Sequence, residues 1–174
     1  MRNTLIVVII CCISMLSSCT EPSPNVDTEG KDEFQALEVE QSTERPTQNY
    51  QDVVYVPIYS DIYANETDQK VLLSATLSVR NTSEVDSLFI SRIDYFDTGG
   101  NIVRSYVGNL ISLPPMATIN YVIEKDDDTG GPGANFIVEL SAEHENVRPL
   151  IQAVMVSHVG NKSFAFSTDG YSVK

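Results

Sequence analysis

The sequence predicts an all-β domain, an antiparallel β-sandwich of immunoglobulin-like type, preceded by a signal peptide and an acidic disordered tether. From residue 50 onward, apolar and polar residues alternate with a period of two in several short segments. Turn residues separate these segments, and no window shows a sustained helical period. Seven or eight such strands favour a sandwich, with a small closed barrel as the alternative. The expected parts are residues 1–18, 19–48 and 49–174.

The N-terminal segment has the three regions of a secretory signal. Arg2 supplies the positive charge, and residues 5–13 (LIVVIICCI) form the apolar region. These nine residues are too few for a membrane-spanning helix, which needs about 20. Leu16-Ser17-Ser18-Cys19 then resembles a lipobox: small side chains precede the cut, and the thiol of Cys19 carries the lipid. An ordinary signal peptide with a chance cysteine is the alternative.

Lipidation of Cys19 implies a protein of the cell envelope that is anchored in the lipid bilayer. Several acyl chains on one residue hold a protein more firmly than a single chain does. Thr20 stands where an aspartate retains lipoproteins in the inner membrane, so in a diderm bacterium we expect the outer membrane, facing the periplasm. Because Cys11 and Cys12 leave with the signal peptide, the mature chain has no free thiol for catalysis, disulfides or metal binding.

Residues 19–48 form the tether that begins at the lipidated cysteine. The segment is acidic and contains Pro22, Pro24 and Pro46. It has too few apolar residues to offset the entropy lost on ordering, so we expect it to be disordered and to hold the domain on the order of 30 Å from the membrane. The net charge of −13 for the whole chain argues against nucleic acid as a partner and against electrostatic attachment to anionic lipid.

The clearest strand signal lies in residues 70–80 (KVLLSATLSVR), where alternate positions are apolar. Residues 117–123 and 134–142 repeat this alternation. Residues 150–159 are apolar in both phases, which predicts a central strand. Residues 164–166 offer a short final strand.

Three local signals refine this arrangement. A slip of the apolar phase near Ser91-Arg92 indicates a β-bulge. Residues 97–101 (DTGGN) predict the turn of a hairpin that returns through residues 102–107. Pro57 limits the first strand of the domain to a sheet edge or a break, since proline lacks a backbone N–H.

The acidic, glycine-rich residues 124–135 (EKDDDTGGPGAN) are the leading candidate for a ligand site. Carboxylates on a flexible loop suit Ca²⁺, and crowded carboxylates repel one another unless a cation or water screens them. The EF-hand spacing fails, because counting from Asp126 puts Ile137 where the bidentate glutamate belongs. The alternative is a solvated loop whose glycines permit positive φ and whose Asn135 caps its own backbone. The candidate ligand residues are Asp126, Asp128, Gly130, Gly131, Gly133 and Asn135.

Other candidate residues have simpler structural interpretations. Tyr55, Tyr59 and Tyr63 suggest a surface that stacks on sugars or peptides, but edge tyrosines more often pack at the rim of a core. A zinc site would need both histidines, His144 and His158, together with carboxylates. There is no Gly-x-Ser-x-Gly motif and no glycine-rich phosphate loop leading into a helix, so no catalytic residue is predicted and no enzyme is expected.

Four segments resemble an uncharacterised bacterial lipoprotein family, known as domain of unknown function thirty-one twenty-four. They are VYVPIYSDIY (54–63), ATLSVRNTS (75–83), IDYFDTGGNIVRSY (93–106) and LPPMATINYVIEKDDDTGGPGANFIVEL (113–140). The resemblance covers nearly all of residues 50–170, and the Gly-Gly-x-Gly-Ala-Asn-Phe block is its most specific part. Pro132 occupies the variable place, where a small polar residue is expected. The family has no known activity, so the resemblance assigns no functional residue.

The sequence therefore favours a non-enzymatic module of the cell envelope. We expect it to bind an envelope protein or polymer through an edge strand or a loop end. A Ca²⁺- or small-ligand-binding lipoprotein that uses loop 124–135 is the second hypothesis, and a hydrolase of an envelope polymer is the third.

Overall fold

The computed structural model describes residues 48–64 and 70–174. The predicted signal peptide, the predicted lipobox with Cys19 and all but the last residue of the predicted tether lie outside these residues. Within them the chain forms strands β1 to β12 and no helix, so the all-β prediction is confirmed. In this part of the chain no helix qualifies as a candidate to span a membrane.

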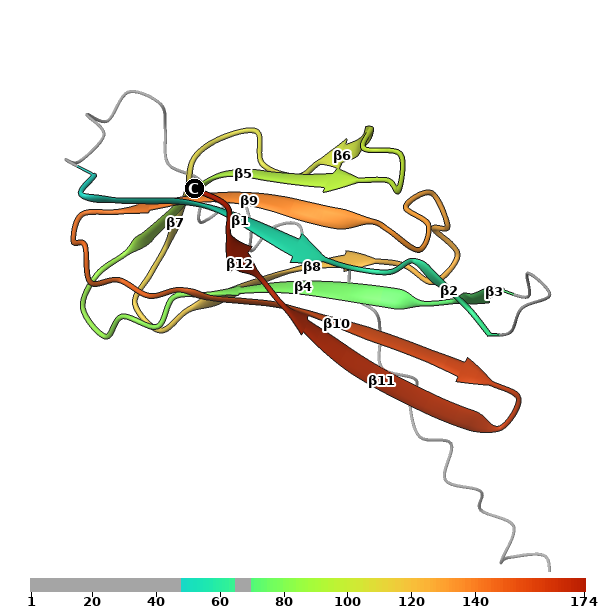
Figure 1. Ribbon diagram of the computed structural model, residues 1–174. Helices are drawn as coiled ribbons and strands as arrows, with labels where there is room; N and C mark the ends of the chain where they lie inside the picture. Colours follow the sequence, from blue (N-terminus) through green and yellow to red (C-terminus); the bar gives the residue numbers. More distant parts are fainter. Residues whose placement is uncertain (1–47, 65–69) are drawn as a thin grey trace, which may run out of the picture. The chain divides into compact units, whose positions relative to one another are not determined.

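The first of two main sheets has six strands (Figure 1). Their order is β12-β1-β9-β5-β6, and β7 also pairs with β5, in each case antiparallel. The strands are β1 (Tyr50–Pro57), β5 (Leu88–Phe96), β6 (Ile102–Ser105), β7 (Ile111–Leu113), β9 (Asn135–Ala142) and β12 (Tyr171–Ser172).

The second sheet has four antiparallel strands in the order β11-β10-β4-β8. A separate pair, β2 with β3, extends from one end of the domain (Figure 1). The strands are β2 (Asp61–Tyr63), β3 (Lys70–Leu72), β4 (Ser74–Arg80), β8 (Thr118–Ile123), β10 (Leu150–Val159) and β11 (Lys162–Asp169).

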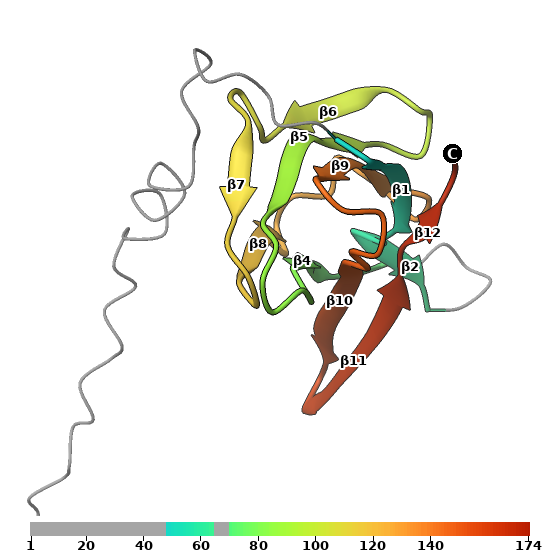
Figure 2. The same ribbon diagram turned by 90° about the vertical axis from the view of Figure 1, so that its left-hand side faces the viewer.

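The two main sheets pack face to face around one apolar core, which confirms the predicted sandwich (Figure 2). Strand β8 illustrates the pattern: Ile119, Tyr121 and Ile123 are buried, whereas the residues between them are exposed. Complete burial of one large apolar side chain stabilises the fold by about 1.5–3 kcal/mol. The largest fully buried side chains are Tyr95, Phe136, Ile58, Leu73, Leu77, Leu88, Ile90, Ile93, Leu113, Ile119, Ile123 and Met155.

Asn81 ties the end of β4 to the turns that lead to the other sheet. It is only 2% exposed. Its side-chain nitrogen lies 2.7, 3.1 and 3.0 Å from the carbonyl oxygens of Asp86, Leu113 and Pro114, which share its two N–H donors. Its side-chain oxygen accepts a hydrogen bond from the backbone N–H of Ser83 at 3.0 Å. One buried side-chain amide thus forms hydrogen bonds with backbone groups of both the β4–β5 and the β7–β8 connections.

Several local predictions are confirmed. The register of β5 against β9 shifts between Ile90 and Arg92, where the bulge was expected. Residues 97–101 form the turn between β5 and β6, closed by a hydrogen bond of 2.9 Å from the N–H of Asp97 to the carbonyl of Asn101. Strand β1 ends at Pro57, which fits the predicted break.

The strand expected over residues 70–80 is divided at Leu73. Residues before Leu73 pair with β2, and residues after it pair with β10 and β8. At the junction, the N–H of Leu73 donates to the carbonyl of Ser60 at 2.9 Å instead of joining either ladder. The apolar alternation continues through the break because Leu73 still points into the core, so the pattern could not reveal the change of partner.

Strand β10 is central in its sheet, as predicted, but only one of its faces is covered. Val154 and Val156 are 40% and 47% exposed on the outer face. Its neighbour β11 is longer than the expected residues 164–166, because its hairpin with β10 runs unbroken from Lys162 to Asp169.

Candidate functional site

The glycine-rich half of loop 124–135 is held against the β5–β6 turn by Thr98. The N–H and the hydroxyl of Thr98 both donate to the carbonyl of Gly130, at 2.8 and 2.9 Å. The N–H of Gly133 in turn donates to the Thr98 hydroxyl at 2.9 Å. Because the loop joins β8 of one sheet to β9 of the other, these bonds fix a crossing between the two layers.

Gly130 is required by close packing on Tyr95. A Cβ atom at this position would lie 1.9 Å from the Tyr95 hydroxyl oxygen and 2.8 Å from Cβ of Ala134. Neither distance is possible between non-bonded atoms, and Gly130 is itself buried. The glycine that sequence analysis offered as a ligand residue therefore has a packing role.

The backbone conformation at Gly131 favours glycine. Its φ is +73°, and a Cβ there would lie 2.7 Å from the Thr98 hydroxyl oxygen. Its carbonyl accepts hydrogen bonds from both the N–H and the hydroxyl of Ser60, each at 3.2 Å. Asn135, the last candidate in this loop, is the first residue of β9 and is half-buried opposite Pro57 and Phe96.

The acidic half of the loop is arranged around Asp127, which sequence analysis did not select. Its carboxylate accepts from a guanidinium nitrogen of Arg104 at 3.3 Å and from the backbone N–H of Thr129 at 3.3 Å. Asp126 and Asp128, the predicted ligands, are both exposed. Within residues 48–64 and 70–174, no three His, Cys, Asp or Glu side chains lie close enough together to hold a metal ion.

A groove of about 420 Å³ lies beside the acidic half of the loop. It is lined by Arg104, Val122, Glu124, Asp126 and Asp127. Three carboxylates against one guanidinium give the groove a negative balance, which favours a cation or an amine over an anion.

Two buried polar atoms near the loop lack hydrogen-bond partners: Oδ1 of Asp61 and the hydroxyl oxygen of Tyr95. Asp61 is 1% exposed, and its other oxygen accepts from Nζ of Lys70 at 3.0 Å, a bond that raises the pKa of Lys70. Burial raises the pKa of Tyr95 above its ordinary value, an effect that the nearby hydroxyls of Ser60 and Thr129 oppose. No sequence motif points to either residue; the only sign of Asp61 is a lone carboxylate in an otherwise uncharged run.

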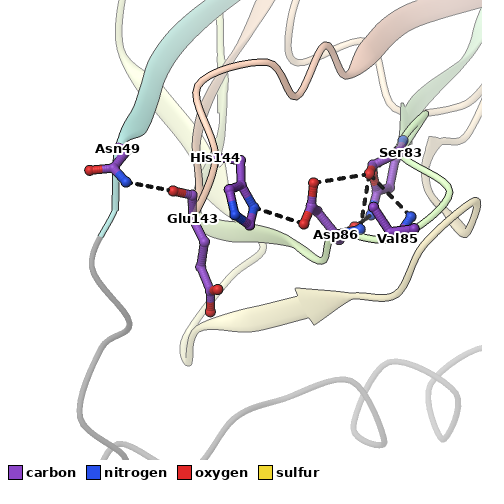
Figure 3. Close-up of polar contacts among 7 residues, drawn as sticks. Asn49, Ser83, Val85, Asp86, Glu143 and His144 are labelled. Carbon is purple, nitrogen blue, oxygen red and sulfur yellow. Dashed lines mark hydrogen bonds and ion pairs between the residues drawn. The ribbon is translucent and has the colours of Figure 1, made fainter.

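The two histidines lie in different places, so they do not form one zinc site. His144 Nδ1 is 2.8 Å from an Asp86 carboxylate oxygen, in the arrangement that Figure 3 shows. His158 lies on β10, 3.4 Å from Nζ of Lys125. Asp86 also contacts the Ser83 hydroxyl, at 3.4 Å. The carboxylate stands between serine and imidazole, whereas a catalytic triad needs the imidazole in the middle.

The three tyrosines do not form one stacking surface. Tyr55 packs on Tyr171 of β12, with ring centroids 5.3 Å apart. Tyr59 packs edge-on against Phe166 of β11 at 5.9 Å. Tyr63 is 55% exposed in β2. Tyr55 and Tyr59 therefore pack against different strands at the rim of the core.

The outer face of the four-stranded sheet carries three exposed valines, which we call the valine strip: Val122, Val154 and Val156. Their exposed fractions are 52%, 40% and 47%. Val154 and Val122 lie on either side of Thr76 in one cross-strand row, and Val156 lies between Ser74 and Ala165 in the next. The two rows contain no charged residue, although the whole chain carries −13.

The packing of Gly130 predicts that Gly130→Ala lowers the free energy of unfolding by about 2–3 kcal/mol, because the added methyl group overlaps Tyr95. Gly108→Ala is the matched control, since a Cβ there would meet no atom within 4 Å. Urea unfolding measures both variants. Equal stabilities of the two would contradict the packing role.

The unpaired Tyr95 hydroxyl predicts that Tyr95→Phe leaves the free energy of unfolding unchanged or raises it by about 1 kcal/mol. Because the pKa of Tyr95 is raised, the folded chain keeps a proton that the unfolded chain releases above pH 10.0. The free energy of unfolding of the wild type therefore falls as the pH rises above 10.0. It should fall less in Tyr95→Phe, which has no hydroxyl group to ionise. Unfolding at pH 8 and above pH 10 tests both points, and a clear destabilisation at pH 8 would show that the hydroxyl has a partner.

Comparisons with known proteins give a family and no activity. No curated protein matches the chain. The crystal structure of Thermotoga maritima 1070 is similar over 71% of this chain and 95% of that one, with 14% identity and a TM-score of 0.42. A family model described as protein of unknown function (DUF3124) matches residues 51–173, from β1 to just beyond β12. The chain therefore belongs to this family, as its sequence motifs predicted.

Proposed function

We propose that this protein is a lipid-anchored, non-enzymatic module of the bacterial cell envelope that binds another envelope protein. The observation that carries the binding role is the valine strip, in which three exposed valines lie in two cross-strand rows without a charged residue. Val122, at one end of the strip, also borders the acidic groove. The anchor is proposed from the sequence Leu16-Ser17-Ser18-Cys19.

An acyl anchor suits the charge of this chain. With 24 acidic and 11 basic residues, the protein is repelled by anionic lipid headgroups. Stable membrane attachment then depends on buried hydrocarbon, which several acyl chains on one cysteine supply.

The chemistry of the valine strip favours a protein over a polysaccharide as partner. Sugar rings are recognised largely by stacking on aromatic side chains, whereas the neighbours of the valines are Ser74, Thr76 and Ala165. Aliphatic side chains exposed side by side gain free energy when a partner covers them, at about 25 cal/mol for each Å² removed from water. The non-enzymatic part of the proposal is supported by Asp86, which separates Ser83 from His144.

The proposed anchor predicts that Cys19→Ser moves the protein from the membrane fraction to the soluble fraction, because the lipid has no thiol to join. Thr20→Ser is the control, since it leaves the cysteine in place. Fractionation of cells and mass spectrometry of the mature N-terminus measure the effect. An unmodified Cys19 thiol in the wild-type protein would refute the anchor.

The proposed binding surface predicts that Val154→Lys abolishes the cross-linking of one defined envelope protein in native membranes, because an ammonium group would be buried without a partner. Val85→Lys is the control: Val85 is 81% exposed in the turn between β4 and β5, away from the strip. A partner captured equally by wild type and by both variants would show that the strip is not its binding site.

A second candidate function is binding of a cation or an amine in the groove beside loop 124–135, favoured by the carboxylates of Glu124, Asp126 and Asp127. This candidate predicts that a millimolar diamine raises the melting temperature, since a ligand selective for the folded state stabilises it. The shift should be smaller in Asp126→Asn and unchanged in Glu84→Gln, which removes an exposed charge elsewhere. No shift in the wild type would exclude a diamine as the ligand.

A further inference from the structure

The outermost strand of the four-stranded sheet, β11, contains a palindrome. Ser163-Phe164-Ala165-Phe166-Ser167 reads the same in both directions, with Ala165 at its centre. An antiparallel pair of identical strands related by a two-fold axis through Ala165 would therefore place each of these residues opposite its own kind.

One edge of β11 has no strand partner among the described residues, since only β10 pairs with it. Figures 1 and 2 both show the β10–β11 hairpin at the margin of the sandwich, with β11 outermost. Ser163, Ala165 and Ser167 are exposed along this edge.

The hairpin geometry fixes which backbone groups face the open edge. The two-residue turn Gly160-Asn161, with φ of +58° at the glycine, closes on the pair Val159 and Lys162. Such a closing pair exchanges backbone hydrogen bonds, so Lys162 and every second residue after it direct their N–H and C=O groups towards β10. The N–H of Gly170, which has the same parity, indeed donates to the carbonyl of Ile151 on β10 at 2.9 Å.

The residues of the other parity, Ser163, Ala165 and Ser167, consequently direct their N–H and C=O groups away from β10. These are the residues that would exchange hydrogen bonds in a two-fold pair centred on Ala165: Ala165 with its copy, and Ser163 with Ser167 in both directions. Three such pairs form about six backbone hydrogen bonds. Ala165, the centre of the palindrome, is thus one of the residues whose backbone groups face the open edge, as the two-fold pair requires.

Strand β11 also lacks the features that usually protect a sheet edge. Between Lys162 and Asp169 it has no charge, proline or glycine, and its register with β10 contains no bulge. The six-stranded sheet is different, because its outer strands are only two to four residues long: β12, β6 and β7. Strand β8, at the far side of the four-stranded sheet, has six residues and carries no palindrome.

We propose that two copies of this protein associate through β11, antiparallel and with the two-fold axis at Ala165, to form one continuous sheet of eight strands. Phe164 of each copy then lies opposite Phe166 of the other on the inner face, where both rings are only partly buried in the single chain. Aromatic pairs that face each other across two strands stabilise a sheet. On the outer face, Val156 and Ala165 of the two copies form one apolar row.

A second copy fits this edge better than an unrelated peptide. Any extended chain offers backbone groups, but a second copy of β11 also supplies small residues opposite small ones and phenylalanine opposite phenylalanine in the same register. The absence of charge between Lys162 and Asp169 keeps the repulsion of two acidic chains away from the contact. The association does not depend on the valine strip having another partner.

Cysteine cross-linking of the full chain in membranes tests the register. In Ala165→Cys, the two Cα atoms should lie about 5.5 Å apart, within the range that a disulfide spans. When both copies carry only Ser163→Cys, or only Ser167→Cys, the two cysteine Cα atoms should lie about 14 Å apart, because the two positions are offset by four residues along the paired strands. We expect a disulfide dimer for Ala165→Cys and for a mixture of the Ser163→Cys and Ser167→Cys chains, and none for either serine variant alone. The wild type controls for its own cysteines.

Sedimentation of the full chain in detergent micelles tests the association without a cross-link. We expect a concentration-dependent dimer for the wild type and for Asn120→Lys, which adds the same charge to the exposed side of β8. Ala165→Lys should weaken the dimer about tenfold or more. At concentrations where the wild type is monomeric, the two melting temperatures should be equal, because Ala165 is exposed in the single chain. A monomeric wild type, equal cross-linking of all cysteine variants, or cross-linking of Ala165→Cys only to a different protein would overturn the proposal.

Discussion

The two main sheets are joined by one apolar core into which their long strands direct every second side chain. This shared burial decides what remains for function. A strand that turns one row of residues inward presents the other row outward, so the outer face of the four-stranded sheet displays Val122, Val154 and Val156. The candidate binding surface is therefore the outer face of a sheet whose inner face forms the core. The alternation of side chains along each strand determines both faces.

Loop 124–135 owes its composition to two separate demands. Gly130 and Gly131 allow the chain to pass Tyr95 and Thr98 at a distance that no side chain would permit. The carboxylates before them lie on the solvent side, where Asp127 pairs with Arg104. The sequence places these two groups next to each other, but the structure separates a packing half from a solvated half. Only the solvated half, with its groove, retains a candidate role in ligand binding.

An open sandwich, unlike a closed barrel, has to end its sheets somewhere. This protein ends the six-stranded sheet with short strands, but it leaves β11 long and uncharged. The proposed pairing of two copies completes that edge and extends the outer apolar face across the two-fold axis. The proposed lipid anchor would confine both copies to one surface and so would raise their effective concentration.

The sequence by itself determined most of the long strands, the bulge near Arg92, the turn at residues 97–101 and the family, because each depends on local alternation, turn residues or a contiguous motif. It also predicts a lipobox, which lies outside the described residues. Only the tertiary structure decided the change of partner at Leu73, the uncovered face of β10 and the burial of Asp61 and Tyr95. Those features depend on which segments meet across the two sheets, and periodicity along one strand does not carry that information.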